Sequence, residues 1–278
     1  MPILPIRTFV EALQRAAPRP ASTADRDEKK NYSERLSNAI AVLLASRLRA
    51  SGHFPTILPA EDGSGRETRS LSGTGRKFKK TDVRYATADT GLELLVSIKT
   101  LNFRDDRSGR YTKNMVRNDH ELRAEAMDHH ERFPFAVLIG VFFLPVDACE
   151  DGASDKSSFA HAVLTFRPRT GRSGHDDAPA KFERFYVGLY DAAEPSDARV
   201  GFFDVLDAPP RRGRPPWPSE PADPRRGGRL IDLEELIAHV AREYGVRNRT
   251  YLRWADEDAA RGEMPDLAGP SDERDGDE

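Results

Sequence analysis

The chain has 278 residues, of which 38% are hydrophobic and 32% are charged, and its formal net charge is −3. This length allows one large domain or two small ones, and the single Cys149 excludes an internal disulfide and a thiolate-based metal cluster. No stretch approaches the ~20 uninterrupted apolar residues of a membrane span, and residues 1–10 lack the layout of a secretory signal. We therefore expect a cytoplasmic protein without a membrane partner.

The two ends of the chain differ in composition from the rest. Residues 255–278 contain ten Asp or Glu and two Arg, a net charge of −8, so the remainder carries +5. We expect this acidic tail to be disordered, and the mildly basic remainder permits a nucleic-acid partner. Residues 1–27 are rich in Pro, Ala, Arg and Ser and predict a flexible arm with one short helix at 8–16. Residues 28–254 then form a single domain.

Apolar residues recur with the periods of helices and strands along this domain. They predict a helix at 28–50, a long loop at 51–80, a hairpin of strands at 81–87 and 92–100, and an amphipathic helix at 113–133. The almost wholly apolar run at 135–144 predicts a central strand. The patterns beyond it predict a helix at 157–166, strands at 183–190 and 200–205, a Pro/Arg-rich loop at 209–229 and a helix at 231–244. This order predicts an α/β fold with a mixed central sheet flanked by helices.

Chemistry-bearing residues lie at the open end of the predicted hairpin. Asp82 begins the first strand, and Ser97 and Lys99 end the second, where alternation places both on one face that can lie beside Asp82. A lysine in so apolar a strand requires an anionic neighbour, because a buried unpaired ammonium is strongly unfavourable. An Asp that binds Mg²⁺ or Mn²⁺, beside a Lys that orients water and offsets phosphate charge, supplies what phosphodiester hydrolysis requires.

This arrangement resembles the PD-(D/E)XK nuclease superfamily, which has an Asp on one strand of a hairpin and a carboxylate-x-Lys on the next. The resemblance covers about residues 28–144. It implies a restriction-endonuclease-like core and a Mg²⁺-dependent endonuclease that hydrolyses phosphodiester bonds of double-stranded DNA. By analogy it also implies a role in restriction or anti-phage defence, with a homodimer as one oligomeric state.

The motif departs from the family at position 97, where Ser97 replaces the usual Glu or Asp. Some restriction enzymes of the superfamily carry Ser-x-Lys and take the second carboxylate from the following helix, which here offers Glu121 and Glu125. The helix predicted at 28–50 offers Glu34, which resembles the helix-borne acid of the family. Glu93 shares the predicted face of the lysine, but it lies about 20 Å up the strand at ~3.3 Å per residue.

We therefore expect a catalytic site composed of Asp82, Lys99, Glu34, Glu121 and Ser97, in which the metal ligands are Asp82 with Glu34 or Glu121. Simpler roles exist, since Glu34 can pair with the lysine one turn earlier and Glu121 can lie on a solvated helix face. The alternative function is a catalytically impaired nuclease-like fold that acts as a DNA-binding or protein-interaction module, which the altered position 97 favours. A structural protein without a nucleic-acid role is a third hypothesis.

Basic and aromatic residues surround the predicted site and are typical of a surface that follows a phosphate backbone. They are Arg76, Lys77, Phe78, Lys79, Lys80, Phe103, Arg104, Arg107, Arg110, Tyr111, Lys113 and Arg117.

Overall fold

A computed structural model describes residues 5–65, 67–69, 78–88, 90–152, 156–191, 198–210, 213–221 and 227–251. Its helices are α1 (Phe9–Ala16), α2 (Arg26–Ala50), α3 (Met115–Arg132), α4 (Ser158–Phe166) and α5 (Leu233–Tyr251), with short 3-10 helices η1 (Val146–Cys149) and η2 (Arg167–Arg169). Its strands are β1 (Glu67–Arg69), β2 (Phe78–Lys80), β3 (Val83–Thr87), β4 (Gly91–Thr100), β5 (Val137–Pro145), β6 (Arg184–Asp191) and β7 (Arg199–Asp204). The predicted acidic tail at 255–278 lies outside the described residues.

Five strands form one mixed sheet in the order β3-β4-β5-β6-β7. The outer pairs β3/β4 and β6/β7 are antiparallel, whereas β4, β5 and β6 run parallel. The predicted α/β class, the hairpin and the central position of the apolar strand are therefore confirmed. The prediction of a long loop at 51–80 is wrong in part, because β1 and β2 pair there as a separate small sheet.

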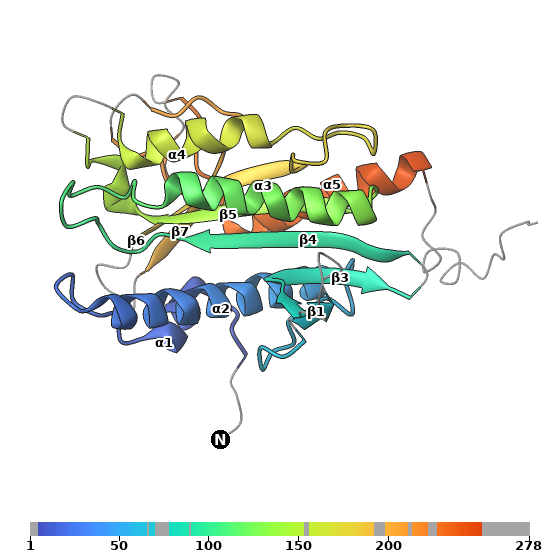
Figure 1. Ribbon diagram of the computed structural model, residues 1–278, viewed down its shortest axis with the longest axis horizontal. Helices are drawn as coiled ribbons and strands as arrows, with labels where there is room; N and C mark the ends of the chain where they lie inside the picture. Colours follow the sequence, from blue (N-terminus) through green and yellow to red (C-terminus); the bar gives the residue numbers. More distant parts are fainter. Residues whose placement is uncertain are drawn as a thin grey trace, which may run out of the picture.

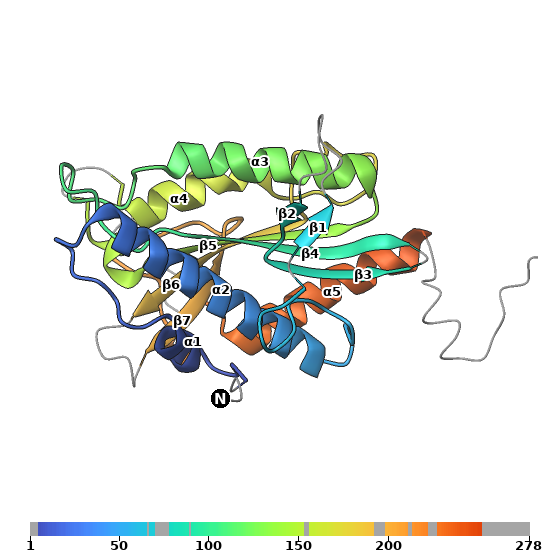
Figure 2. The same cartoon turned by 60° about the horizontal axis from the view of Figure 1, so that its bottom comes forward.

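Helices cover both faces of the five-stranded sheet (Figures 1 and 2). Helices α3 and α4 lie on one face, and α1, α2 and α5 lie on the other. Strand β5 shows why the sheet is buried on both sides: Ile139 and Val141 belong to the core under α2 and α5, and Leu138 and Phe142 belong to the core under α3 and α4. A strand covered on both faces needs apolar residues at every position, which explains its unbroken apolar sequence.

The described part of the predicted N-terminal arm contains the short helix expected at 8–16, and this helix packs against the core. Thr8 caps α1 and forms a capping box with Glu11, and the buried Phe9 ring stacks on Phe143 of β5 with 6.3 Å between centroids. Ile6 and Leu13 are buried in the same core. Proline and arginine content suggested a loose segment, but a few apolar residues at helical spacing are enough to attach it to the domain.

The predicted Pro/Arg-rich loop at 209–229 is also attached to the domain in its described part. Trp217 is buried in the core under α3 and α4, and Arg214 lies over its ring at 5.4 Å. Arg214 also donates two hydrogen bonds to Glu220, at 2.8 and 2.6 Å. The segment has no strand or helix in its described residues, but these contacts give it a defined position.

Candidate functional site

Three of the five predicted site residues, Glu34, Asp82 and Lys99, line a pocket at the edge of the sheet, between α2 and α3. Strand β3 begins at Val83, which pairs with Val96, so the last residues of β4 extend beyond the β3/β4 pairing. The pocket beside this free edge has a volume of about 330 Å³. We call it the edge pocket, and it is lined by Lys30, Ser33, Glu34, Ser37, Lys80, Asp82, Ile98, Lys99, Thr100 and Glu125.

Asp82 is held at the pocket by the backbone of the neighbouring strand. Its carboxylate accepts a hydrogen bond of 2.8 Å from the Ile98 N–H, one residue before Lys99. Both Asp82 and Lys99 line the edge pocket. The hairpin thus brings together the acid and the amine that the sequence places at its open end.

Lys99 has an anionic partner on α3. Its ammonium lies 3.3 Å from the Glu121 carboxylate, and Arg117 donates to the same carboxylate at 2.8 Å. Burial acts to raise the pKa of Glu121, but Arg117 and Lys99 outweigh it and the net shift is downward. Glu121 is therefore a counter-ion of Lys99, and it is not among the residues that line the edge pocket.

Glu125 takes the place in the pocket that the sequence assigned to Glu121. It lies one helical turn further along α3, is buried, and lines the edge pocket. The sequence offers both glutamates on one polar strip of the helix, and only the position of α3 relative to β4 distinguishes them.

Glu34 approaches the edge pocket from α2, on the opposite face of the sheet from α3. Its carboxylate lies 3.8 Å from the Lys30 ammonium, and the side chain is 62% exposed. The surface ion pair considered from the sequence is therefore present, and an exposed pair of this kind is weak enough to exchange for another ligand.

Ser97 lies behind the pocket and not on its wall. The side chain is completely buried, and its hydroxyl has no hydrogen-bond partner among the described residues. A neutral hydroxyl in this position contributes no charge to the pocket, so any carboxylate needed beside Asp82 has to come from the helices.

Glu93 does not share the face of Lys99, in contrast to the interpretation from strand alternation. The β3/β4 register shifts between Tyr85 and Ala86, which leaves Glu93 as an extra residue in β4. Its carboxylate accepts a hydrogen bond of 2.6 Å from Tyr244 of α5. A bulge of one residue reverses the alternation beyond it, so Glu93 faces α5 and not the face of Lys99.

In the described part of the chain, the edge pocket offers carboxylate oxygens to a hard cation, but not a complete set of ligands. Among the described residues no group of three or more His, Cys, Asp or Glu is arranged as a metal site. Mg²⁺ is commonly held by one or two carboxylates, with water and substrate phosphate oxygens completing its octahedron. Asp82 with Glu34 or Glu125 offers carboxylates of this kind.

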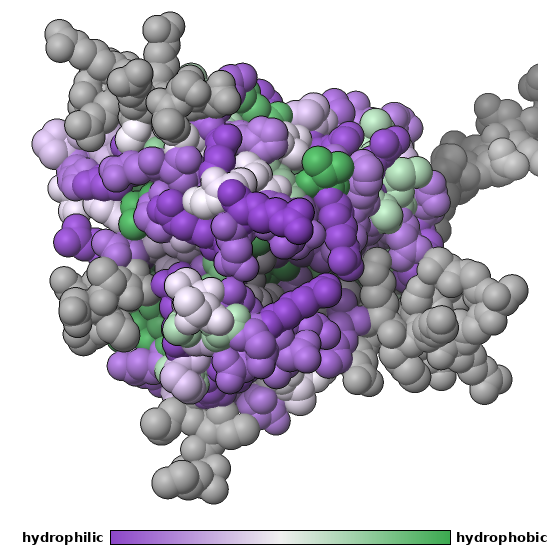
Figure 3. Space-filling view, turned by 60° about the vertical axis from the view of Figure 1, so that its left-hand side comes forward, coloured by the Kyte–Doolittle hydropathy of each residue, from purple (hydrophilic) through white to green (hydrophobic). Residues whose placement is uncertain are grey.

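Several basic residues predicted to follow a phosphate backbone instead form ion pairs in the loop after β4. Arg104 binds Asp147 at 2.8 Å, and Lys113 binds Asp105 at 3.0 Å. Arg76 and Lys77 lie outside the described residues. The end of the molecule where β4 ends and α3 begins is nevertheless largely hydrophilic, with hydrophobic residues in small groups (Figure 3).

Comparison of the chain with protein-family models, curated proteins and solved structures finds no match. The helices of the described residues include none with both the length and the apolarity to cross a bilayer. Function therefore has to be argued from the edge pocket.

Proposed function

We propose that this chain is a metal-dependent endonuclease that hydrolyses DNA phosphodiester bonds at the edge pocket. The observation that carries the proposal is that one pocket is lined by Asp82, Lys99 and two helix-borne carboxylates, Glu34 and Glu125. An acid and an amine beside further carboxylates at a hydrophilic surface suit a substrate that carries phosphate charge and arrives from water.

In this proposal Asp82, with Glu125 or Glu34, holds Mg²⁺ or Mn²⁺. A bound Mg²⁺ would supply Lewis-acid stabilisation of the charge that develops on the phosphate. The Lys99 ammonium would lie next to the scissile phosphate, where it offsets negative charge and orients water. Glu121 would keep Lys99 in position through its ion pair, so it is a positioning residue rather than the metal ligand that the sequence suggested.

A restriction-endonuclease-like core is part of this proposal. The order α2, β3/β4 hairpin, α3 and parallel β5 is consistent with a restriction-endonuclease-like core. Four further parts of the proposal rest on the resemblance alone. They are double-stranded DNA as substrate, a homodimer, a cytoplasmic location and a part in restriction or anti-phage defence.

Plasmid cleavage by the full chain, with Mg²⁺ or with a chelator, tests the proposal. We expect metal-dependent cleavage that falls by at least about 100-fold in Lys99→Ala, because removal of one group that stabilises transition-state charge costs ~10²–10³ in rate. Lys181→Ala is the matched control, since Lys181 is partly buried like Lys99 but lies outside the edge pocket and the predicted basic surface. Cleavage by Lys99→Ala at the rate of the control would exclude the assigned site.

The second candidate is a nuclease-like module that binds DNA without cleaving it. Ser97, buried and uncharged where the family has a carboxylate, is the observation that favours it. Isothermal titration separates the two candidates. A binding-only module takes up DNA in a salt-dependent manner but shows no specific heat of Mg²⁺ or Mn²⁺ binding.

A further inference from the structure

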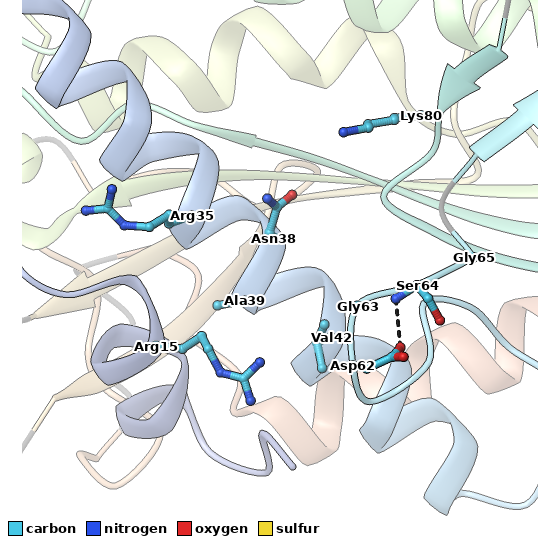
Figure 4. Close-up of a pocket in the computed structure, with 10 residues that line it drawn as sticks. All are labelled: Arg15, Arg35, Asn38, Ala39, Val42, Asp62, Gly63, Ser64, Gly65 and Lys80. Carbon is cyan, nitrogen blue, oxygen red and sulfur yellow. Dashed lines mark hydrogen bonds between the residues drawn. The ribbon is translucent and has the colours of Figure 1, made fainter. Parts of the chain in front are cut away.

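A second, larger pocket adjoins the edge pocket on the α2 side of the molecule. Its volume is about 650 Å³, within the range of ~300–1,000 Å³ that is usual for ligand sites. We call it the basic pocket (Figure 4), and it is lined by Arg15, Arg35, Asn38, Ala39, Val42, Asp62, Gly63, Ser64, Gly65 and Lys80.

Among the charged side chains of its walls, three are cationic and one is anionic. Arg15 comes from α1, Arg35 from α2 and Lys80 from the end of β2, against the single carboxylate of Asp62. Asp62 accepts a hydrogen bond of 2.9 Å from the Ser64 N–H, within its own loop. The hydrogen bonds from Ser64 lower the pKa of Asp62, so this carboxylate stays charged and the lining carries a net charge of about +2 at neutral pH.

The three cations differ in how they face the basic pocket. Arg35 is used for structure, since its guanidinium donates to the Ala16 and Pro18 carbonyls at 2.9 and 3.3 Å. Arg15 extends from α1 alongside α2, and Lys80 extends from β2 toward Asn38 (Figure 4). The side chains of Arg15 and Lys80 are exposed, so a ligand from solvent can reach both.

The basic pocket and the edge pocket form neighbouring sections of one surface. Lys80 lines both of them. Helix α2 also lines both, from Lys30 in the edge pocket to Val42 in the basic pocket. These two positions are about 18 Å apart at ~1.5 Å per residue. A nucleic-acid strand presents one phosphate per ~3.4 Å of helix axis, so this length corresponds to about five phosphates.

We propose that the basic pocket is a phosphate subsite, in which Arg15 and Lys80 bind the sugar-phosphate backbone of the strand whose scissile bond lies in the edge pocket. This inference rests on the proposed function and extends it, because it specifies the direction in which the strand leaves the site. An open pocket with a single carboxylate and exposed cations suits backbone phosphates, which are recognised by charge and not by base sequence.

The test compares cleavage and binding of two single-stranded DNA oligonucleotides, of about three and about 20 nucleotides, by the full-length protein. The short strand fills the edge pocket only, whereas the long strand reaches the basic pocket. In Arg15→Gln we expect kcat/KM for the long strand to fall about tenfold more than for the short one. We also expect the salt dependence of long-strand binding, log Kd against log [NaCl], to lose about 0.7 in slope, the value for one single-strand phosphate contact.

Arg242→Gln provides the matched control, since Arg242 is an exposed arginine of α5 that lines neither pocket. Arg15→Lys should restore most of the long-strand activity, because the charge returns while the bidentate geometry does not. Lys80→Gln should weaken the binding and cleavage of both oligonucleotides, since Lys80 lines both pockets. Thermal unfolding of each variant shows whether its fold is retained.

The outcomes distinguish this inference from the proposed function. If the wild type cleaves both strands and Arg15→Gln behaves like Arg242→Gln, the subsite is refuted and the nuclease proposal stands. Equal losses on the short and long strands also refute the subsite. If inorganic phosphate at micromolar concentration displaces the long strand, the basic pocket is a site for a small anion and not for a strand. If the wild type cleaves neither these strands nor plasmid DNA with metal present, the proposed function itself fails. If it cleaves plasmid DNA alone, the salt slope of long-strand binding decides the subsite, and an unchanged slope in Arg15→Gln refutes it.

Discussion

Substitution of Asp82 separates the structural role of its carboxylate from its proposed role as a metal ligand. The carboxylate accepts the Ile98 N–H at 2.8 Å, and the amide oxygen of an asparagine can accept the same hydrogen bond. Hydrogen bonds to charged groups contribute about 1.5–3 kcal/mol and neutral ones about 0.5–1.5 kcal/mol. Asp82→Asn should therefore lower the free energy of unfolding by about 1 kcal/mol, and Asp82→Ala by about 1.5–3 kcal/mol.

The effect on catalysis should be much larger than the effect on stability. The amide introduced by Asp82→Asn lacks the negative charge that a hard cation requires, so we expect this variant to lose at least about 100-fold in cleavage rate. Urea unfolding, Mg²⁺ titration and plasmid cleavage, carried out on both variants, provide the comparison. Asp106→Asn is the matched control, because Asp106 is an aspartate with an 86% exposed side chain outside the edge pocket.

Two results would refute this reasoning. Unchanged Mg²⁺ affinity and cleavage in Asp82→Asn would show that the carboxylate is no metal ligand. Equal unfolding free energies for Asp82→Asn and Asp82→Ala would show that the hydrogen bond to Ile98 does not stabilise the end of β4.

Two further predictions concern stability. Glu121→Gln removes the partner of Lys99 and Arg117, at a cost of no more than about 1 kcal/mol for so exposed a cluster. Because the folded-state pKa of Glu121 lies below 4.5, this difference from wild type should be complete above about pH 4.5 and disappear as the pH falls through the lowered pKa. Urea unfolding at several pH values checks it, and a constant difference at all pH values would contradict it. Ser97→Ala removes a buried hydroxyl that has no partner among the described residues, so the free energy of unfolding should rise by about 1 kcal/mol and Tm by about 2–4 °C. A fall in Tm, measured by calorimetry, would show that the hydroxyl is satisfied in solution.

Local pattern was sufficient for most of the fold. The periods of 3.6 and 2 residues follow from which side chains face the core, and this information lies within each segment. The helix predicted at 28–50 corresponds to α2, which begins slightly earlier because the side chain of Asp25 caps it and accepts from the Glu28 N–H at 2.8 Å. The unbroken apolar run at 135–144 likewise predicted the central strand β5.

Features that depend on contacts between distant segments were missed. Composition could not reveal that Phe9 reaches β5, because the ring it stacks on, Phe143, is far away in the chain. Alternation failed at Glu93 because a bulge is a property of two paired strands. Glu183, predicted only as the start of a strand, binds the buried Arg172 and Arg247 at 3.0 and 2.5 Å.

The candidate site divides in the same way. Asp82 and Lys99 were recognisable in the sequence because a hairpin is a local structure. The ends of its two strands and the alternation of side chains determine which residues lie side by side. The choice of the remaining carboxylates was open until helix positions were known. The packing of α3 against the sheet directs Glu121 to Lys99 and Glu125 to the edge pocket, and one turn of a helix, about 5.4 Å, separates these two roles. The basic pocket was invisible in the sequence, since α1, α2 and the end of β2 meet only in the folded chain.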